Sequence, residues 1–155
     1  MSGAETEALE DGRQSPAALR IARGTRRFLR NLDMTTLTEV PLRSNRRADL
    51  VAVGPKGEIW IIEIKSSVAD FRADTKWPDY RQHCDRFFFA TALDVPVAIF
   101  PSDAGLIIGD GFSAAVEWEA PLVPLASATR KELLVRLGRL AADRLHALQD
   151  PALPL

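Results

Sequence analysis

Residues 46–65 read RRADLVAVGPKGEIWIIEIK, and the architecture of the chain depends on them more than on any other segment. The GPKG sequence at 54–57 predicts a tight turn, because its proline is preset for the second turn position and Gly57 suits a left-handed backbone. We expect a three-residue hairpin loop with a glycine bulge, joining strands over residues 47–53 and 58–65. The turn therefore sets which residues of the two strands lie opposite one another.

Counting back from this turn brings two acids and a lysine together. Asp49 lies opposite Glu63 in the expected register, and directly opposed residues share one face with their Cβ atoms about 5 Å apart. Lys65 follows two residues after Glu63 and faces the same way, because strand side chains alternate between faces. The hairpin therefore predicts one pocket shared by two carboxylates and an ammonium group.

This constellation has two interpretations from the residues alone. Two carboxylates at one end of an apolar sheet repel each other and lose hydration, so they need a proton, a cationic partner or a divalent metal. Mg²⁺ prefers carboxylate oxygens with several waters, and a neighbouring lysine could deprotonate an attacking water or stabilise charge developing on a phosphate. The other interpretation is an ordinary cross-strand ion-pair set among Arg47, Asp49, Glu63 and Lys65.

The remaining elements predict an α/β fold, with a mixed sheet flanked by helices and a long C-terminal helix. Both hairpin strands are apolar on both faces, so helices must cover both sides of the sheet. Ser15 and Pro16 predict the start of the first helix, and Thr129 and Glu132 form a capping box that opens the last one. We expect further strands at 34–42, 87–90, 97–100, 106–108 and 114–118, with a loop at 66–76 and a turn at 109–111. A short helix is expected from Trp77. The final helix is expected over 129–148, and the residues that it buries are Leu133, Leu137, Leu140, Ala141 and Leu148.

Length and composition are those of an ordinary globular chain. It has 155 residues, of which 46% are hydrophobic and 26% charged, and its net charge is −1. We therefore expect a single domain over residues 15–150, preceded by a disordered acidic tail over residues 1–14. No apolar run approaches the roughly 18 residues of a membrane span, and one cysteine, Cys84, excludes a disulfide framework. These features favour a cytoplasmic protein with no membrane partner.

Positive charge gathers near the N-terminus. Residues 13–47 carry nine arginines against Asp33 and Glu39, a net charge of +7. Like charges three or four residues apart on one helix face repel, so an anionic partner such as DNA would compensate them. A solvated basic face and a protein interface are the alternatives. The arginines on this face are Arg20, Arg23, Arg27 and Arg30.

Two resemblances follow from these residues. The spacing from Asp49 to Glu63-Ile64-Lys65 resembles the PD-(D/E)xK signature of restriction-endonuclease-like phosphodiesterases. Arg47 occupies the position two residues before the acid, where the proline that gives the signature its first letter stands. The longer run RRADLVAVGPKGEIWIIEIKSSVADFRADTKWPDYRQHCDRFFFA resembles the MmcB-like bacterial DNA-repair family, and this likeness covers residues 17–145. Together they imply a restriction-endonuclease-like core.

The resemblance implies a function as well as a fold. Asp49 and Glu63 would ligate Mg²⁺ or Mn²⁺, with the Ile64 carbonyl as a third ligand, and Lys65 would be the catalytic lysine. We therefore expect a DNA-repair-associated, nuclease-like protein in which a metal-activated water attacks a phosphodiester of DNA. The alternative is a non-catalytic DNA-binding or scaffold module that retains the fold. In either case a homodimer or a repair-protein partner could supply further DNA-binding surface.

Other residues are candidates for the same site. Members of the superfamily often add a polar residue from the following helix, for which Gln82 and Tyr80 are the candidates. Glu39 faces Asp49 if the loop at Ser44-Asn45 has three residues, and faces away if it has two. Arg47 is a further DNA-binding candidate. The segment after the lysine offers three more: Ser66 and Lys76 toward phosphates, and Trp77, which either stacks on an unpaired base or covers the sheet.

Overall fold

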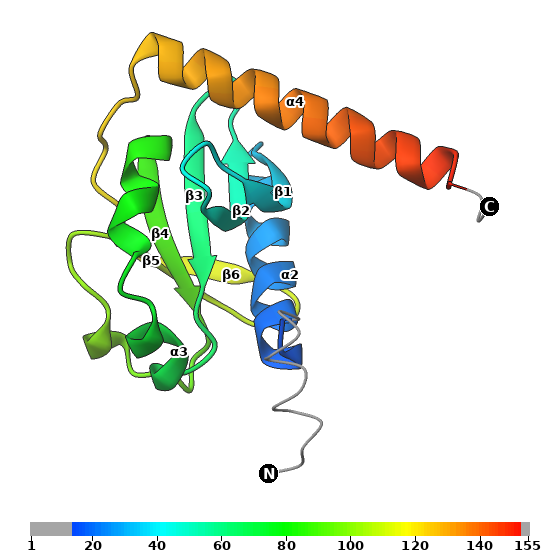
Figure 1. The fold of residues 1–155 in the computed structure, drawn as a ribbon. Helices are drawn as coiled ribbons and strands as arrows, with labels where there is room; N and C mark the ends of the chain where they lie inside the picture. The colour runs from blue at the N-terminus through cyan, green and yellow to red at the C-terminus, as the bar shows by residue number, and fades with distance from the viewer. Residues whose placement is uncertain (1–13, 153–155) are drawn as a thin grey trace.

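One six-stranded sheet, with its strands in chain order, forms the centre of the fold (Figure 1). The computed structural model describes residues 14–152, so the predicted acidic tail lies outside the described residues except for Gln14. The strands are β1 (Thr35–Pro41), β2 (Arg47–Val53), β3 (Ile59–Ile64), β4 (Arg86–Thr91), β5 (Gly105–Gly109) and β6 (Ala114–Trp118). The pairs β1–β2, β2–β3 and β5–β6 are antiparallel, whereas β3–β4 and β4–β5 are parallel. The predicted mixed sheet is confirmed.

The turn between β2 and β3 has the expected geometry. The N–H of Gly57 donates to the carbonyl of the first glycine of the turn at 3.0 Å, and Gly57 has a φ of 87°, which glycine adopts without steric cost. The strand pairing continues from this turn as far as Leu50 and Ile62. One further step of the same register places Asp49 opposite Glu63, as the sequence predicts.

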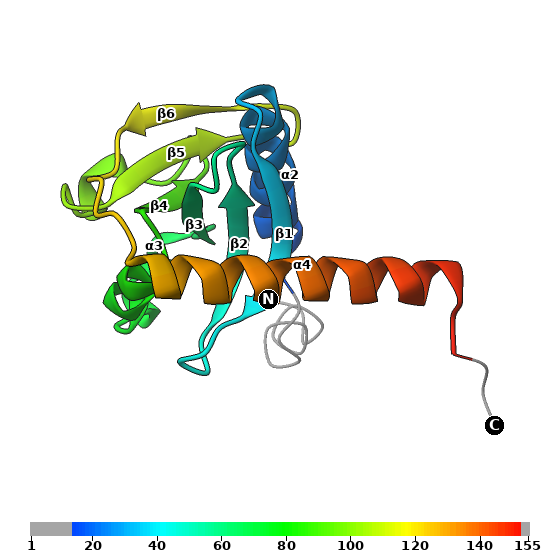
Figure 2. The same cartoon turned by 90° about the horizontal axis from the view of Figure 1, so that it is seen from above.

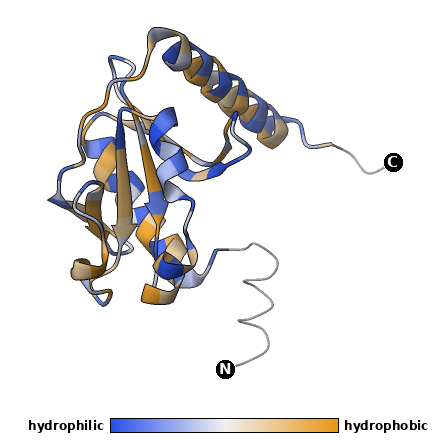
Figure 3. Cartoon of the chain, turned by 60° about the vertical axis from the view of Figure 1, so that its left-hand side comes forward, coloured by the Kyte–Doolittle hydropathy of each residue, from blue (hydrophilic) through white to orange (hydrophobic). Residues whose placement is uncertain are grey.

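Helices cover both faces of the sheet. One face is covered by α2 (Pro16–Asn31), and the other by α3 (Val68–Ala73), the 3₁₀ helix η1 (Trp77–His83) and the first half of α4 (Ser127–Gln149) (Figure 1). Apolar residues are concentrated in the strands between these layers (Figure 3). Ile62 packs in the core under α2 and Ile61 in the core under η1. Because strand side chains alternate, Glu63 lies on the η1 face, opposite α2.

The first helix begins as predicted and the last one does not. Ser15 Oγ accepts a hydrogen bond from the N–H of Ala18 at 3.1 Å, so Ser15 is the N-cap of α2. The N-cap of α4 is Ala126, which makes no side-chain cap bond, and Glu132 instead pairs with Arg136 at 2.7 Å. The predicted capping box at Thr129 and Glu132 is therefore wrong, because the helix starts two residues earlier.

The second half of α4 runs past the sheet beyond β1 (Figure 2). Leu133 and Leu137 are buried, but Leu148 is 80% exposed, so the prediction that it is buried is wrong. The reason is that no layer of the described structure lies beneath that end of the helix. Within residues 14–152, no helix has the length and apolar character needed to cross a membrane.

Two connecting segments also differ from the sequence prediction. Part of the expected loop at 66–76 is the helix α3, which Ser67 caps by accepting the N–H of Asp70 at 3.0 Å. The expected strand at 97–100 contains the 3₁₀ helix η2 (Val97–Ile99). The parallel strands β4 and β5 pair directly with each other, so this segment serves as the crossover between them rather than as a member of the sheet.

Helix α2 and the β5–β6 hairpin meet at Gly24, where a Cβ would overlap the carbonyl oxygens of Asp110 and Ser113. We expect Gly24→Ala to lower the free energy of unfolding by about 1–3 kcal/mol, the usual cost of overpacking. Gly138→Ala is the matched control, because no neighbouring atom lies within 4 Å of its added Cβ in α4, and it should raise stability by about 0.5–1 kcal/mol. Urea denaturation measures both effects. A Gly24→Ala variant as stable as the parent would contradict the close packing.

Candidate functional site

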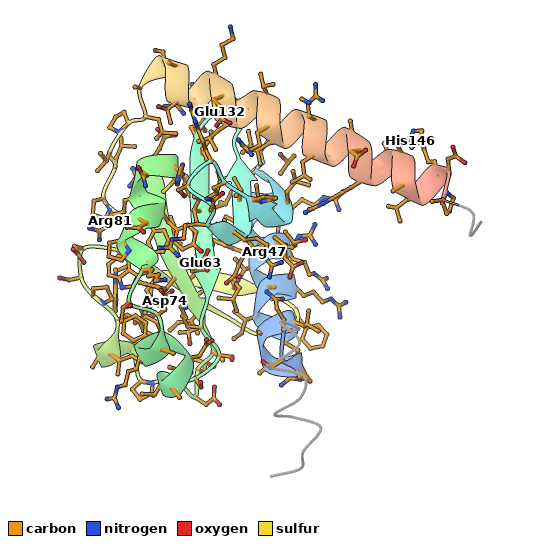
Figure 4. All side chains as sticks on the ribbon, in the orientation of Figure 1. Arg47, Glu63, Asp74, Arg81, Glu132 and His146 are labelled. Atoms are coloured by element: carbon orange, nitrogen blue, oxygen red, sulfur yellow. The ribbon has the colours of Figure 1, made fainter. Side chains whose placement is uncertain are left out.

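Two carboxylates from neighbouring strands, those of Asp49 and Glu63, lie together at the centre of the candidate site; Figure 4 labels Glu63, with Arg47 and Asp74 around it. The N–H of Asp49 donates to Glu63 Oε1 at 3.0 Å, and the N–H of Ile64 donates to Asp49 Oδ2 at 2.8 Å. Each carboxylate therefore binds the backbone of the opposite strand through one oxygen. Glu63 is only 4% exposed. Within the described residues neither carboxylate forms an ion pair, so the alternative of a cross-strand ion-pair set is not what the structure shows.

The electrostatics of this pair oppose two negative charges side by side when no metal is present. Burial raises the pKa of Asp49, and it raises the pKa of Glu63 well above its usual value. The negative charge of Asp49 raises the pKa of Glu63 further, and the hydrogen bond between the two carboxyl groups lowers that of Asp49 while raising that of Glu63. The charge of Lys65 lowers both pKa values, but its effect is smaller than that of burial.

Lys65 lies beside the pair and is held by Asp74, an acid that is not among the site residues predicted from the sequence. Its side chain is nearly buried, and Nζ is 2.7 Å from Asp74 Oδ2. Asp74 directly follows α3, the helix that was expected to be a loop. Ser67 and Asp70, three residues apart, are a recognisable N-terminal capping signal, and this signal could have predicted the helix that brings Asp74 to the lysine.

Of the two candidates from the helix that follows Lys65, Gln82 and Tyr80, the structure places Tyr80 beside the carboxylate pair. Its hydroxyl donates to the backbone carbonyl of Arg47 at 3.0 Å. Burial and the negative charges of Glu63 and Asp49 raise the pKa of Tyr80, so its phenol stays protonated. Gln82 is exposed on the same 3₁₀ helix and takes no part in the hydrogen bonds that join the site residues in the described chain.

Glu39 is not brought to the carboxylate pair. The β1–β2 loop does have three residues, because the N–H of Leu42 donates to the carbonyl of Arg46 at 2.7 Å, and the register does place Glu39 opposite Asp49. However, Glu39 has a left-handed backbone with a φ of 49°, which interrupts the regular alternation of side chains. Its side chain is exposed and lines a groove with the arginines of α2.

The predicted DNA-binding residues near the site have different environments. Trp77 packs into the core, since its ring stacks on Phe87 with centroids 5.6 Å apart and Arg81 lies over it at 4.8 Å. These contacts occupy the ring and support the interpretation that it covers the sheet. Arg47 and Lys76 are exposed, and Ser66 is half-buried.

The arginines of α2 lie on the other face of the sheet from the carboxylates. Arg20, Arg23, Arg27 and Arg30 are all exposed, as predicted from their spacing. Three of them line the groove between α2 and β1 together with Arg26, which was not predicted. The sequence periodicity identifies the exposed face of the helix, but only the tertiary structure shows which face of the sheet that helix covers.

The donor atoms present fit a hard divalent cation. In the part of the chain that the structure describes, no group of three or more His, Cys, Asp and Glu side chains is arranged to hold a metal. The available donors are Asp49, Glu63 and the carbonyl of Ile64. Mg²⁺ is commonly held through one or two carboxylates with waters completing its shell, and a divalent charge would offset the repulsion between the two carboxylates.

Because the pKa of Glu63 is raised, ionisation of this carboxyl in the metal-free protein lowers the free energy of unfolding. A carboxyl whose pKa is higher in the folded protein contributes stability at low pH, and that stability is lost as pH rises toward the folded pKa. We therefore expect Glu63→Gln, which keeps the acceptor for the N–H of Asp49, to raise the melting temperature in EDTA more at pH 8 than at pH 5. Glu117→Gln, at an exposed position of β6, is the control. If Glu63→Gln changed the melting temperature by the same amount at both pH values, this result would contradict the raised pKa of Glu63.

The fold and the site define a class of protein: a mixed α/β domain whose central hairpin holds a buried and a half-buried carboxylate beside a lysine. Residues 5–152 match the family described as DNA repair protein MmcB-like. The chain therefore belongs to the MmcB-like DNA repair family, and the resemblance of its sequence to that family is confirmed. A solved structure of a protein of unknown function from Silicibacter pomeroyi is 43% identical, with a TM-score of 0.84 over 89% of this chain and 94% of that one. No curated protein matches the chain.

Proposed function

We propose that this MmcB-like protein binds DNA and hydrolyses its phosphodiester bonds in a metal-dependent reaction of the PD-(D/E)xK type. The observation that carries the proposal is the Asp49–Glu63 pair, with Glu63 buried and Asp49 half-buried, which has no cationic partner within bonding distance in the described chain. Holding two carboxylates side by side with little water costs stability, and groups held at such a cost are concentrated at functional sites. The membership of a DNA repair family makes DNA the expected substrate.

Asp49, Glu63 and the Ile64 carbonyl would hold Mg²⁺ or Mn²⁺. When bound, the metal would supply an activated water and polarise the scissile phosphate. Lys65 is 6% exposed as a residue, and its ammonium is held by Asp74 next to these ligands. There it can donate hydrogen bonds to the water or to charge developing on the phosphate, in a site with little competing solvent.

Other residues of the chain position these groups and the substrate. The phenol of Tyr80 binds the backbone of Arg47 and so fixes the start of β2, two residues before Asp49. Arg47 and Lys76 are exposed at the margin of the site, where their charges can attract DNA phosphates. Ser66 directly follows the lysine and offers a hydroxyl. These contacts would hold a phosphodiester near the carboxylate pair.

The test is incubation of the protein with duplex, nicked, branched and single-stranded DNA in the presence of Mg²⁺ or Mn²⁺. We expect product from the wild-type protein with at least one of these substrates, none in EDTA, and none from Asp49→Asn. Equal product from wild type and Asp49→Asn would identify a contaminating nuclease. That result, or no product from any substrate, would overturn the proposal.

One observation favours a second candidate, a non-catalytic DNA-binding module. The Nζ of Lys65 is already paired with Asp74 at 2.7 Å, and an ammonium held in this way is less free to act on a water or a phosphate. In that case we expect DNA binding without hydrolysis and no change in DNA affinity in Lys65→Met. Direct binding measurements with both proteins separate the two candidates.

A further inference from the structure

An exposed aromatic side chain lies among the arginines of α2. Phe112, in the loop between β5 and β6, is 73% exposed. The guanidinium carbon of Arg23 is 6.0 Å from the centre of its ring, and the side chain of Arg20 passes beside Gly111. Figure 2 shows the β5–β6 turn next to α2, on the side of the sheet away from α3. A large apolar ring in water between cationic side chains has no role in the core.

The loop that carries Phe112 is held in place. The carboxylate of Asp110 accepts the N–H of Phe112 at 2.7 Å and that of Ser113 at 2.9 Å, and the N–H of Asp110 donates to the carbonyl of Ser113 at 3.0 Å. The same loop backbone rests on Gly24 of α2. The ring is therefore presented from a fixed support, and the carboxylate of Asp110 is engaged by the loop backbone.

Arg23 connects this ring to the groove between α2 and β1. Among residues 14–152, the groove is lined by four guanidinium groups, those of Arg23, Arg26, Arg27 and Arg30, and by one carboxylate, that of Glu39. Arg26 is held across it by a hydrogen bond from Nε to Thr36 Oγ1 at 2.9 Å. Guanidinium groups match phosphate geometry through paired hydrogen bonds, so the groove suits a chain of phosphates.

We propose that the groove and Phe112 together bind an unpaired strand of nucleic acid, with its phosphates on the arginines and a base stacked on the ring. A positively charged groove combined with an exposed aromatic ring is how proteins bind single strands. Bases within a duplex are stacked on one another and offer no free face to such a ring. The inference rests on the proposed DNA function and gives it a substrate class: DNA with a single-stranded segment, held on the face of the sheet opposite the carboxylates.

The experiment measures binding of a labelled oligothymidylate and of a blunt duplex of the same length, by fluorescence anisotropy in EDTA. We expect Phe112→Ala to weaken oligothymidylate binding by about 10-fold, the effect of losing one base stack, and to leave duplex affinity within about twofold. Phe112→Trp should retain binding, and the fluorescence of the new indole should be quenched by the oligonucleotide. Leu93→Ala, at another exposed apolar position (86% exposed), should change neither affinity.

Three results would overturn the inference: unchanged oligothymidylate affinity in Phe112→Ala, an equal loss for the duplex, or binding of a polyglutamate peptide that depends on Phe112 as strongly as DNA binding does. The last would identify the groove as a site for an acidic protein segment. The outcome is separable from that of the proposed hydrolysis, because binding is measured in EDTA, where metal-dependent hydrolysis does not take place. A protein that hydrolyses no DNA but loses single-strand binding in Phe112→Ala would refute the hydrolysis and support this inference.

Discussion

We expect Lys65→Met to lower the rate of metal-dependent DNA hydrolysis by about 10²- to 10³-fold, the usual effect of removing one positioned charge at a reacting phosphate. Methionine keeps the length of the buried stem and removes only the ammonium group. The loss should appear in kcat rather than in KM, because the ammonium lies beside the carboxylate pair at a buried position. Single-turnover cleavage of a labelled DNA substrate measures the effect directly.

Lys76→Met is the matched control for this variant. Lys76 is exposed and its N–H bonds the same Asp74 that holds Lys65, so it shares the neighbourhood but not the buried position. Its removal should raise KM by a small factor and leave kcat unchanged, as expected for a phosphate contact on the surface. Hydrolysis by Lys65→Met within about threefold of the wild-type rate would remove the lysine from the mechanism.

The largest stability effect is expected at Asp85, which ties three parts of the fold together. Its Oδ2 accepts the N–H of Ile59 at 2.8 Å, its Oδ1 accepts the N–H of Leu125 at 2.9 Å, and both oxygens accept from Arg130 of α4 at 2.7 Å. Asp85→Asn would leave the guanidinium without its counter-charge and turn an amide toward backbone donors. We expect a loss of about 3 kcal/mol, whereas Asp103→Asn, in an exposed pair, should cost about 0.5 kcal/mol or less.

The same network predicts part of the acid sensitivity of the protein. Burial alone would raise the pKa of Asp85, but the hydrogen bonds from Arg130 and the backbone lower it to about 2. A lowered carboxyl pKa contributes stability that is complete above the unfolded pKa near 4 and disappears as pH falls toward 2. Urea denaturation between pH 2 and pH 5 should show this loss in the wild type and not in Asp85→Asn. Parallel pH curves for the two proteins would contradict the assignment.

The parts of the site that follow from local turn chemistry were predictable from the sequence. The turn at residues 54–57 sets a register that pairs Asp49 with Glu63, and strand alternation adds Lys65 to the same face. A tight turn leaves few alternative pairings, and an apolar strand cannot shift by one residue without moving its acid to the other face. The geometry of the hairpin therefore needed no information from the rest of the chain.

The partners of these residues were not predictable in the same way. Asp74 reaches Lys65 through α3, a helix too short to show a clear hydrophobic period. The conformation of Glu39 depends on a left-handed backbone that its side chain does not favour. Likewise, helical spacing shows that the α2 arginines are exposed together, but their position opposite the carboxylates depends on how the helix packs. The last two features depend on contacts between segments distant in sequence, whereas the short helix had a local signal in its Ser67–Asp70 cap.

Calorimetric titration of Mn²⁺ into the metal-free protein tests the central claim most directly. We predict saturable binding of one ion by the wild type, with a heat that depends on the ionisation enthalpy of the buffer because the Asp49–Glu63 pair releases a proton. Asp49→Asn should bind no ion, and Asp94→Asn, at an exposed position, should bind like the wild type. No binding by the wild type, or equal binding by Asp49→Asn, would contradict the assignment of this pair as a metal site.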